Sequence, residues 1–442
     1  MSGLKNNTHA KLLDRFYQRM IHLLFKPMRL GQLTMMLPDG SVRKYGTGQG
    51  GHCVLMHVHH KNFFKKCFWS GPMGFSEAYV DGDWSSDDVT GVVAWMLLNV
   101  DHLSVLVSDK KKWSPVNYLQ VVNNIMGFFR RNTLKGSQQN IYEHYDLGNR
   151  FFKMFLDPTM TYSSAFFEHK NQSLQDAQLM KYEKLCQSLR LNSDDHVLEI
   201  GSGWGGFAIY AAGKYGCRIK TITISQEQYA FAKQRIADEG LSDLIEIEIL
   251  DYRKLEGQYD KIVSIEMIEA VGDQFLPVYF EKIQRCLKKD GLVALQMILS
   301  PDHRYKYFKK DIDWIQKYIF PGSLLPCMTA IQNAVNSTGD LILYHYEDIT
   351  PHYAKTLRLW RDRFNRELSF ENKLNLSQGF IRKWNYYLSY CEAAFTMRNI
   401  SVAQAVFTRA NNQMIDRHIY NTNNRDIKVE PSPQLRFSKP MK

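Results

Sequence analysis

A glycine-rich loop is the segment of this sequence best suited to hold a ligand. The stretch VLEIGSGWGGFAIYAA (197–212) passes from apolar residues through a glutamate into a loop and then into a helix-like pattern. Its four glycines are Gly201, Gly203, Gly205 and Gly206. Because glycine has no Cβ, a flat or charged ligand can approach the main chain, and the helix that follows directs its amides at the ligand. The loop therefore predicts a site for a nucleotide-like molecule.

The spacing of this loop argues against a nicotinamide dinucleotide. The glycines follow G-S-G-W-G-G rather than G-x-G-x-x-G, and Trp204 would crowd a pyrophosphate. The next strand ends in Thr-Ile-Ser (223–225), where an acidic residue that holds a ribose would be expected. The acidic residue comes earlier, at Glu199, near where a cationic amine would lie. These features favour S-adenosylmethionine as the ligand.

Alternating strands and helices must position the loop. Strands are predicted at 196–200, 218–224, 245–250, 260–265 and 291–299, and a strand-like segment at 402–410. Helices are predicted at 173–190, 205–215, 226–239 and 273–289. This alternation predicts an α/β fold, a mostly parallel sheet with helices on both faces, and a ligand beyond the carboxyl ends of the strands.

The rest of the chain divides into flanking segments. Residues 1–131 read as a small, mixed, basic domain with a turn at 38–40, a helix in 87–100 and another helix that starts at Ser114 and Pro115. A polar linker is expected at 132–140, the catalytic domain at 141–410 and a disordered tail at 411–442.

Composition limits the possible partners and location. The seven cysteines are odd in number and form no CxxC pair, which predicts neither a disulfide framework nor a metal site and favours the cytoplasm. No apolar run approaches the roughly 18 residues that span a bilayer, and basic residues interrupt the only apolar patch near the start. The net charge is +11, and basic residues repeatedly adjoin aromatics, as in FFKK (63–66) and YKYFKK (305–310). An anionic surface is the expected partner, and the recurrence favours lipid over nucleic acid.

Nine strings, in order across roughly residues 70–410, resemble the cyclopropane-fatty-acyl-phospholipid synthases and their mycolic-acid relatives. They are EHYDLGNRFF (143–152), MTYSSAFF (160–167), VLEIGSGWGG (197–206), TISQEQ (223–228), LDYRKL (250–255), SIEMIEAVG (264–272), KYIFPGSLLP (317–326), HYAKTLRLWRDRF (352–364) and YCEAAF (390–395). The resemblance implies a class I, Rossmann-like methyltransferase that is peripherally associated with a membrane.

The implied reaction transfers the methyl or methylene carbon of S-adenosylmethionine onto a cis double bond of an unsaturated phospholipid acyl chain, and a carbocation then closes to a cyclopropane ring. The implied cofactor contacts are Tyr162, Ser163, Gly201, Gly203, Trp204, Gly205, Thr223, Gln228, Tyr252 and Arg253, to which our own analysis adds Glu199. A dry pocket with aromatic walls would protect the cation. Candidates for these walls are Tyr162, Phe166, Phe167, Trp314, Tyr318, Phe320 and Trp360, although for each residue taken singly ordinary core is the favoured interpretation.

Ring closure needs a base, and in the resembled family that base is a bicarbonate ion. The family holds it with a glutamate, a cysteine, a histidine and a tyrosine. Glu269 and Tyr353 match, whereas Ser164 replaces the cysteine and Gln296 replaces the histidine. Serine and glutamine can still donate hydrogen bonds to an anion. These replacements nevertheless leave the last step open, because the cation could instead yield a methylene- or methyl-branched chain.

Other interpretations stay open from the sequence alone. Cys391 lies at the family's long-suspected active-site cysteine, although a thiolate beside a carbocation would be alkylated, so the residue could simply line the pocket. A methyltransferase for another small molecule or a protein would share the loop. An RNA methyltransferase would explain the charge but usually has an N/D-P-P-Y/F strand end, which SIEMIEAVG lacks. A non-enzymatic lipid-binding protein and a homodimer are also compatible with the sequence.

Overall fold

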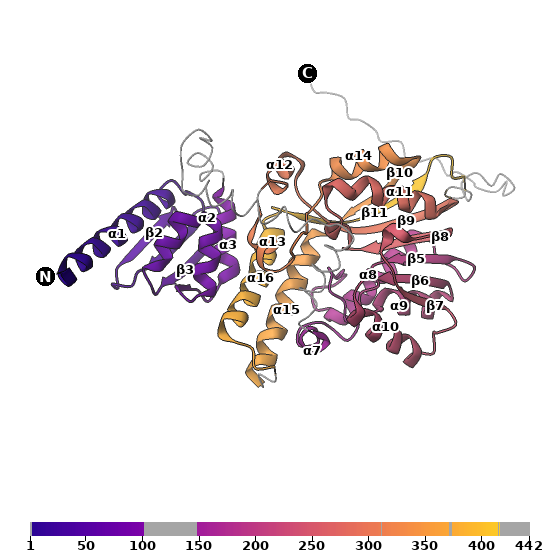
Figure 1. Cartoon of the computed structure of the whole chain (residues 1–442), viewed down its shortest axis with the longest axis horizontal. Coiled ribbons are helices and arrows are strands. Elements are labelled where there is room, and N and C mark those ends of the chain that lie inside the picture. The colour runs from indigo at the N-terminus through magenta and orange to yellow at the C-terminus, as the bar shows by residue number, and fades with distance from the viewer. Residues whose placement is uncertain (1, 101–147, 311, 371–373, 414, 416–442) are drawn as a thin grey trace, which may run out of the picture.

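The computed structural model describes residues 2–100, 148–310, 312–370, 374–413 and 415, with side chains from residue 12 onward. The helix expected from Ser114, the linker at 132–140 and nearly all of the tail lie outside these residues. Two sheets organise the described chain. Figure 1 shows the smaller sheet with its helices at one end of the molecule and the larger sheet at the other, with a pair of long helices between them.

Residues 2–100 form a four-stranded sheet with three helices. Its elements are α1 (Ser2–Phe25), β1 (Gln32–Met36), β2 (Val42–Gly46), β3 (Cys53–Val58), α2 (Asn62–Val80), β4 (Trp84–Ser85) and α3 (Val89–Leu98). The strand order is β2-β1-β3-β4. The turn expected at 38–40 is confirmed, because β1 and β2 pair as a hairpin across it and Asp39 accepts a hydrogen bond from the Ser41 N–H (3.0 Å). The helix expected in 87–100 is confirmed as α3.

The larger sheet has seven strands in the order β10-β11-β9-β8-β5-β6-β7. They are β5 (His196–Ile200), β6 (Arg218–Thr223), β7 (Ile245–Ile249), β8 (Tyr259–Ile265), β9 (Leu287–Leu299), β10 (Leu341–Asp348) and β11 (Ser401–Arg409). Strands β5 to β9 pair in parallel, and β11 runs antiparallel to both β9 and β10. The chain leaves β5 toward β6 and later returns to its other side at β8, so the strand order reverses at β5, where such sheets bind ligands.

Helices cover both faces of this sheet. The covering helices are α8 (Leu174–Leu189), α9 (Gly206–Tyr215), α10 (Gln226–Asp238), α11 (Leu276–Cys286) and α14 (Met328–Thr338). One apolar core joins α8, α9 and α10 to the sheet, and another joins α11 and α14 to it. The helix predicted at 273–289 is shorter than expected. It begins after a 3₁₀ turn (Asp273–Phe275) and ends at Cys286, because Leu287 already pairs with Tyr259 as the first residue of β9.

Two long helices, α15 (Thr350–Phe370) and α16 (Gln378–Thr396), connect the two parts of the molecule (Figure 1). The buried Glu392 on α16 pairs with Arg358 (2.8 Å) and Arg361 (2.7 Å) of α15. On another face of α16, the Tyr386 hydroxyl bonds to Ser76 of α2 (2.7 Å). Helix α16 thus packs against both the N-terminal part and α15. The shorter helices are α7 (Gly148–Lys153), α12 (Tyr305–Phe308) and α13 (Trp314–Tyr318), with 3₁₀ turns at Tyr252–Lys254, Ile268–Ala270 and Asp302–Arg304.

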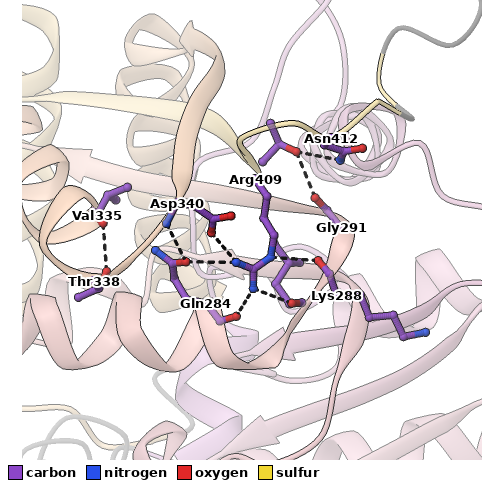
Figure 2. Close-up of polar contacts among 10 residues, drawn as sticks. Gln284, Lys288, Gly291, Val335, Thr338, Asp340, Arg409 and Asn412 are labelled. Atoms are coloured by element: carbon purple, nitrogen blue, oxygen red, sulfur yellow. Dashed lines mark hydrogen bonds and ion pairs between the residues drawn. The ribbon is translucent and has the colours of Figure 1, made fainter.

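Arg409 fastens the antiparallel edge of the sheet (Figure 2). Its guanidinium donates to the Leu287 carbonyl (2.9 Å) and to the Gln284 carbonyl at the end of α11, and it pairs with Asp340 just before β10. One side chain therefore holds three elements that are far apart in the sequence.

In the described ranges no helix combines the length and the apolar character needed to cross a bilayer. Nor do three His, Cys, Asp or Glu side chains gather there in a way that could hold a metal ion.

Candidate active site

A cavity of about 360 Å³ lies at the carboxyl ends of the parallel strands. The loops after β5, β6, β7 and β8 form one side of it, and residues 308–325 with α15 and α16 form the other. The sequence-predicted residues that line it are Tyr162, Ser163, Glu199, Gly201, Gly203, Trp204, Thr223, Gln228, Tyr252, Arg253, Glu269, Tyr353 and Cys391. Gly205, Ser164 and Gln296 were also predicted but are not among the lining residues. The fold therefore brings most of the predicted set to one site.

The glycine loop presents bare main chain to this cavity. Gly203 has a φ of 49°, and a Cβ built there would meet no atom within 4 Å, so it would project into open space. Gly206 is required for a different reason, because a Cβ there would lie 2.4 Å from the Tyr182 hydroxyl. Gly205 has a φ of 83° and caps α9. Gly203 thus leaves room for a ligand, whereas Gly205 and Gly206 shape the turn.

Polar side chains surround the loop in the pattern expected for an adenosyl sulfonium ligand. Glu199 at the end of β5 is buried, accepts a hydrogen bond from Thr221 Oγ1 (2.6 Å), and burial raises its pKa to about 8. Thr223 at the end of β6 donates to Gln228 Oε1 (2.9 Å). Because a charged amine placed beside Glu199 would favour the ionised carboxylate, these residues fit the cationic cofactor.

The indole of Trp204 is fixed by contacts with α7. Its Nε1 donates to Asn149 Oδ1 (2.6 Å), and its ring contacts Phe152 with centroids 4.9 Å apart. Arg253 is fixed by two bonds to the carboxylate of Asp251, from Nε (2.8 Å) and Nη2 (2.6 Å). These contacts fix the walls of the cavity around the glycines.

A second acidic group, which sequence reasoning missed, lies beyond β8. Glu266 accepts hydrogen bonds at Oε1 from the Ser164 N–H (2.8 Å) and Gln296 Nε2 (2.7 Å). Its Oε2 accepts from the Tyr353 hydroxyl (2.6 Å). Both predicted residues therefore contact an anion that is a side chain of the protein, Gln296 through its amide and Ser164 through its backbone N–H, whereas the Ser164 hydroxyl donates to the Ala165 carbonyl (3.0 Å). The sequence signal was the first glutamate of the string SIEMIEAVG, three residues before Glu269.

Glu269 contrasts with Glu266 in its surroundings. Its Oε1 accepts one hydrogen bond, from the Ile298 N–H (2.5 Å), and its buried Oε2 has no hydrogen-bond partner among the described residues. Burial, and then the nearby charge of Glu266, raise the pKa of Glu269 to about 8. At neutral pH this carboxyl group is therefore protonated.

Lys181 on α8 is another buried group that the sequence did not single out. Its Nζ donates to Ser163 Oγ (2.7 Å), and burial lowers its pKa to about 7, against the opposite effect of Glu266. Its neighbours on the buried face of α8 include Ala177, Gln178 and Leu185. The sequence signal for a buried lysine was the position of Lys181, which falls at helical spacing among the apolar residues of this face.

The far side of the cavity is rich in aromatic rings. Tyr162 and Phe320 line it as expected, whereas Phe166, Phe167, Trp314, Tyr318 and Trp360 do not. Phe167, Trp314 and Trp360 are buried core residues, which agrees with the alternative interpretation. Trp360 is fully buried behind Tyr162, with ring centroids 5.3 Å apart. In their place α16 contributes Tyr387, Tyr390 and Phe395.

Cys391 lies on the same helix and lines the cavity. Burial raises the pKa of its thiol, which keeps the sulfur protonated. A protonated thiol is a poor nucleophile, which favours a place in the wall over an attacking role for Cys391.

Comparison with known proteins connects this geometry to a family. The family model described as mycolic acid cyclopropane synthetase matches residues 132–405. The tuberculostearic acid methyltransferase UfaA1 of Mycobacterium tuberculosis is 38% identical over 346 residues, 77% of this chain and 79% of that protein. The cyclopropane-fatty-acyl-phospholipid synthase of Escherichia coli K12 is 35% identical over 357 residues, 80% of this chain and 87% of that protein.

Solved structures agree with the sequence relatives. The mycolic acid cyclopropane synthase CmaA1 complexed with SAH and CTAB aligns with a TM-score of 0.55 at 27% identity, over 62% of this chain and 98% of that one. The cyclopropane synthase MmaA2 from Mycobacterium tuberculosis aligns with a TM-score of 0.57 at 26% identity, over 62% and 98% of the two chains. The expected fold and enzyme class are therefore confirmed: this chain belongs to the mycolic acid cyclopropane synthetase family and is an S-adenosylmethionine-dependent methyltransferase of lipid acyl chains.

Proposed function

We propose that the protein transfers the methyl carbon of S-adenosylmethionine onto a cis double bond of an unsaturated phospholipid acyl chain, and that the resulting carbocation closes to a cyclopropane ring. The observation that supports this most is that one cavity has two unlike halves. The half beside the glycine loop is polar and contains Glu199, whereas the half beside α16 is built from aromatic rings. A polar cofactor and an apolar chain would meet where these halves join.

The cofactor would lie over the glycine loop. When bound, S-adenosylmethionine supplies an electrophilic methyl group on a positively charged sulfur. The bare main chain of Gly201 and Gly203 would admit the cofactor, and Glu199 would compensate positive charge beside it. The other proposed contacts are Tyr162, Ser163, Trp204, Thr223, Gln228, Tyr252 and Arg253, with Gly205 supporting the turn.

The acyl chain would lie against the aromatic half. An alkene is a weak nucleophile, so the reaction depends on holding its double bond close to the methyl group in a site without water. The faces of Tyr162 and Tyr387 would stabilise the cation that follows, and neither ring would trap it as water would. The hydroxyls of these two tyrosines bond to each other (2.9 Å), which occupies the polar atoms nearest to the chain.

The bicarbonate expected from the family resemblance does not fit the described side chains. Ser164, Gln296 and Tyr353 were expected to hold that ion together with Glu269. In the structure the Gln296 amide, the Tyr353 hydroxyl and the Ser164 backbone N–H already donate to the carboxylate of Glu266, and the Ser164 hydroxyl donates to the Ala165 carbonyl. We therefore derive no step through bicarbonate.

A second candidate differs only in the last step. The same transfer could end in a methylene- or methyl-branched chain if the cation loses another proton. The observation in its favour is that the relative with 38% identity carries the name of a methyltransferase rather than of a cyclopropane synthase.

The N-terminal part would bring the enzyme to an anionic membrane at the cytoplasmic face. A groove of about 670 Å³ between α1 and β2 is lined by six basic residues, Arg15, Arg19, Lys26, Arg29, Arg43 and Lys44. Next to it, α1 exposes an apolar stripe in which Leu12, Phe16 and Leu23 retain 60%, 48% and 51% of their surface. Cationic and apolar faces on one helix are typical of helices that lie on membrane surfaces.

The test is to express the chain in a bacterial host that lacks enzymes of this kind and to analyse its fatty acids by mass spectrometry. The expected product is heavier than its unsaturated precursor by one CH₂, and its fragmentation shows a ring. A Gly203→Val variant, which blocks the cofactor loop, is the matched control and should give no product. Products with a methylene or methyl branch would favour the second candidate, and unchanged fatty acids would contradict both.

A further inference from the structure

Glu266 stands in a backbone conformation that glutamate rarely adopts. Its φ is 49°, in the left-handed region, and its own N–H donates to the Gln296 carbonyl (2.7 Å). Residues other than glycine occupy this region infrequently, and such positions concentrate where function requires them. This conformation directs the side chain of Glu266 into the lining of the cavity instead of along the path of β8.

The carboxylate of Glu266 is held like a bound anion. Both oxygens are engaged by three donors from three separate segments, namely Ser164, Gln296 and Tyr353. Gln296 is itself fixed, because its Oε1 accepts from Gln404 Nε2 (3.0 Å) and its Nε2 therefore points toward Glu266. Three donors that converge on one carboxylate stabilise its charged form and fix its position.

The surroundings of Glu266 and Glu269 indicate which of the two carboxyl groups carries a proton. Glu266 accepts three hydrogen bonds and lies in the field of the Lys181 ammonium, whereas Glu269 accepts one hydrogen bond and leaves one oxygen bare. Two close carboxyl groups do not both ionise in a buried site. Glu266 is therefore the anion and Glu269 the protonated partner. Burial still raises the pKa of Glu266 above its ordinary value, toward the pH at which a general base works best.

We propose that Glu266 is the base of the ring-closing step, a carboxylate of the protein in the position where the family resemblance implies a bicarbonate ion. This inference rests on the proposed function. After methyl transfer, a C–H bond of the added methyl group breaks and its electron pair forms the new C–C bond to the cationic carbon. The proton passes to an oxygen of Glu266, and it returns to solvent after the product leaves. No other reactant is needed.

Ser164, Gln296 and Tyr353 are then positioning residues. Their hydrogen bonds go to the carboxylate of Glu266, so these donors fix the base and do not act on the lipid. The same assignment explains why glutamine can replace the expected histidine, since its partner is a fixed side chain and not an exchangeable ion. Residue 164 contributes its backbone N–H, which serine and cysteine supply equally.

The test uses the purified full-length protein, S-adenosylmethionine and vesicles of dioleoyl phosphatidylglycerol, in buffer freed of carbon dioxide and again with added bicarbonate. Formation of S-adenosylhomocysteine reports methyl transfer, and mass spectrometry of the lipid reports the ring. The wild-type protein should form the ring at the same rate in both buffers. Glu266→Gln should form it about 100-fold more slowly or worse, the usual contribution of a general base, with its affinity for the cofactor unchanged within about twofold.

Glu266→Gly is the second variant, because glycine accepts the left-handed backbone and leaves the three donors free for an ion. Its ring formation should be low in the depleted buffer and rise with added bicarbonate. Exposed Glu256→Gln is the matched control and should behave like the wild type in both buffers.

The outcomes separate this inference from the proposed function. Release of S-adenosylhomocysteine by Glu266→Gln with uncyclised, methylated lipid would support the assignment. Ring formation by Glu266→Gln at the wild-type rate, or a wild-type protein that requires bicarbonate, would overturn it while leaving the methyl transfer intact. A wild-type protein that transfers no methyl group to the lipid would overturn the proposed function and the role of Glu266 together.

Discussion

Replacing Glu269 by glutamine should stabilise the protein more and more as the pH rises. Burial and the charge of Glu266 raise the pKa of Glu269 from 4.5 to about 8. In the unfolded chain this carboxyl group loses its proton near its ordinary pKa, whereas the folded protein keeps the proton up to about pH 8. Between these two values the folded state binds the extra proton, so the wild type loses stability as the pH increases.

The magnitude follows from the two pKa values. Each unit of difference corresponds to about 1.4 kcal/mol. Over the whole interval from 4.5 to about 8, the free energy of unfolding of Glu269→Gln should gain about 5 kcal/mol relative to the wild type. Between pH 5.5 and pH 8, the range in which most domains can be studied, the gain should be about 3 kcal/mol. Glutamine does not titrate, so this pH-dependent part belongs to Glu269.

The assay is urea unfolding followed by fluorescence at several pH values, without cofactor, for the wild type, Glu269→Gln and the exposed control Glu256→Gln. The difference between wild type and Glu269→Gln should grow steadily from pH 5.5 to pH 8, while the control tracks the wild type. A difference that stays constant with pH would refute the reasoning, because it would mean that Glu269 is ionised in the folded protein at neutral pH.

Three further variants test other parts of the structure. Gly203→Ala adds a Cβ to the open loop at a φ of 49° and should weaken cofactor binding at least about tenfold by calorimetry, whereas Gly213→Ala within α9 should not. Cys391→Ala should retain methyl transfer within about threefold of the wild-type kcat, since a protonated wall residue supplies no nucleophile; a loss of a hundredfold or more would contradict this role. Arg409→Met should lower the free energy of unfolding by about 2 kcal/mol in urea, because it removes the donors to the Gln284 and Leu287 carbonyls, whereas the exposed Arg285→Met should change it by less than about 0.5 kcal/mol.

The parallel half of the sheet was predictable from the sequence because its strands are short, apolar and separated by helices with clear caps. Ser173 and Ser225, for example, each accept a backbone hydrogen bond at the start of a helix. Strand β10 was missed. It lies at the edge of the sheet and most of its residues are exposed, so it lacks the apolar alternation that marks a half-buried strand.

The long helices α15 and α16 were also missed as helices. Helix α16 carries three tyrosines and an asparagine, whose intrinsic helix propensity is modest. Its stability comes from packing against α2, α3 and α15, which only the tertiary structure provides. The cavity wall that α16 contributes was unpredictable for the same reason.

The cofactor half of the site was largely predictable because its residues follow the ends of consecutive strands. The network around Glu266 was not. Ser164 and Tyr353 lie 102 and 87 residues away from Glu266 in the sequence, and nothing in the spacing says that they meet. A family pattern suggested an anion among these donors but could not reveal that the chain supplies it.

Because of the position of α16, the N-terminal part cannot be removed without changing the surroundings of a helix that lines the cavity. One side of it donates from Arg382 to the carbonyls of Tyr79 (2.6 Å) and Trp84 (2.7 Å), and the other side borders the cavity through Tyr387 and Cys391. A shortened protein that starts near residue 148 would lack the carbonyls of Tyr79 and Trp84, to which Arg382 donates, and the Ser76 hydroxyl, which bonds to Tyr386. Both α16 side chains would then be left without these partners.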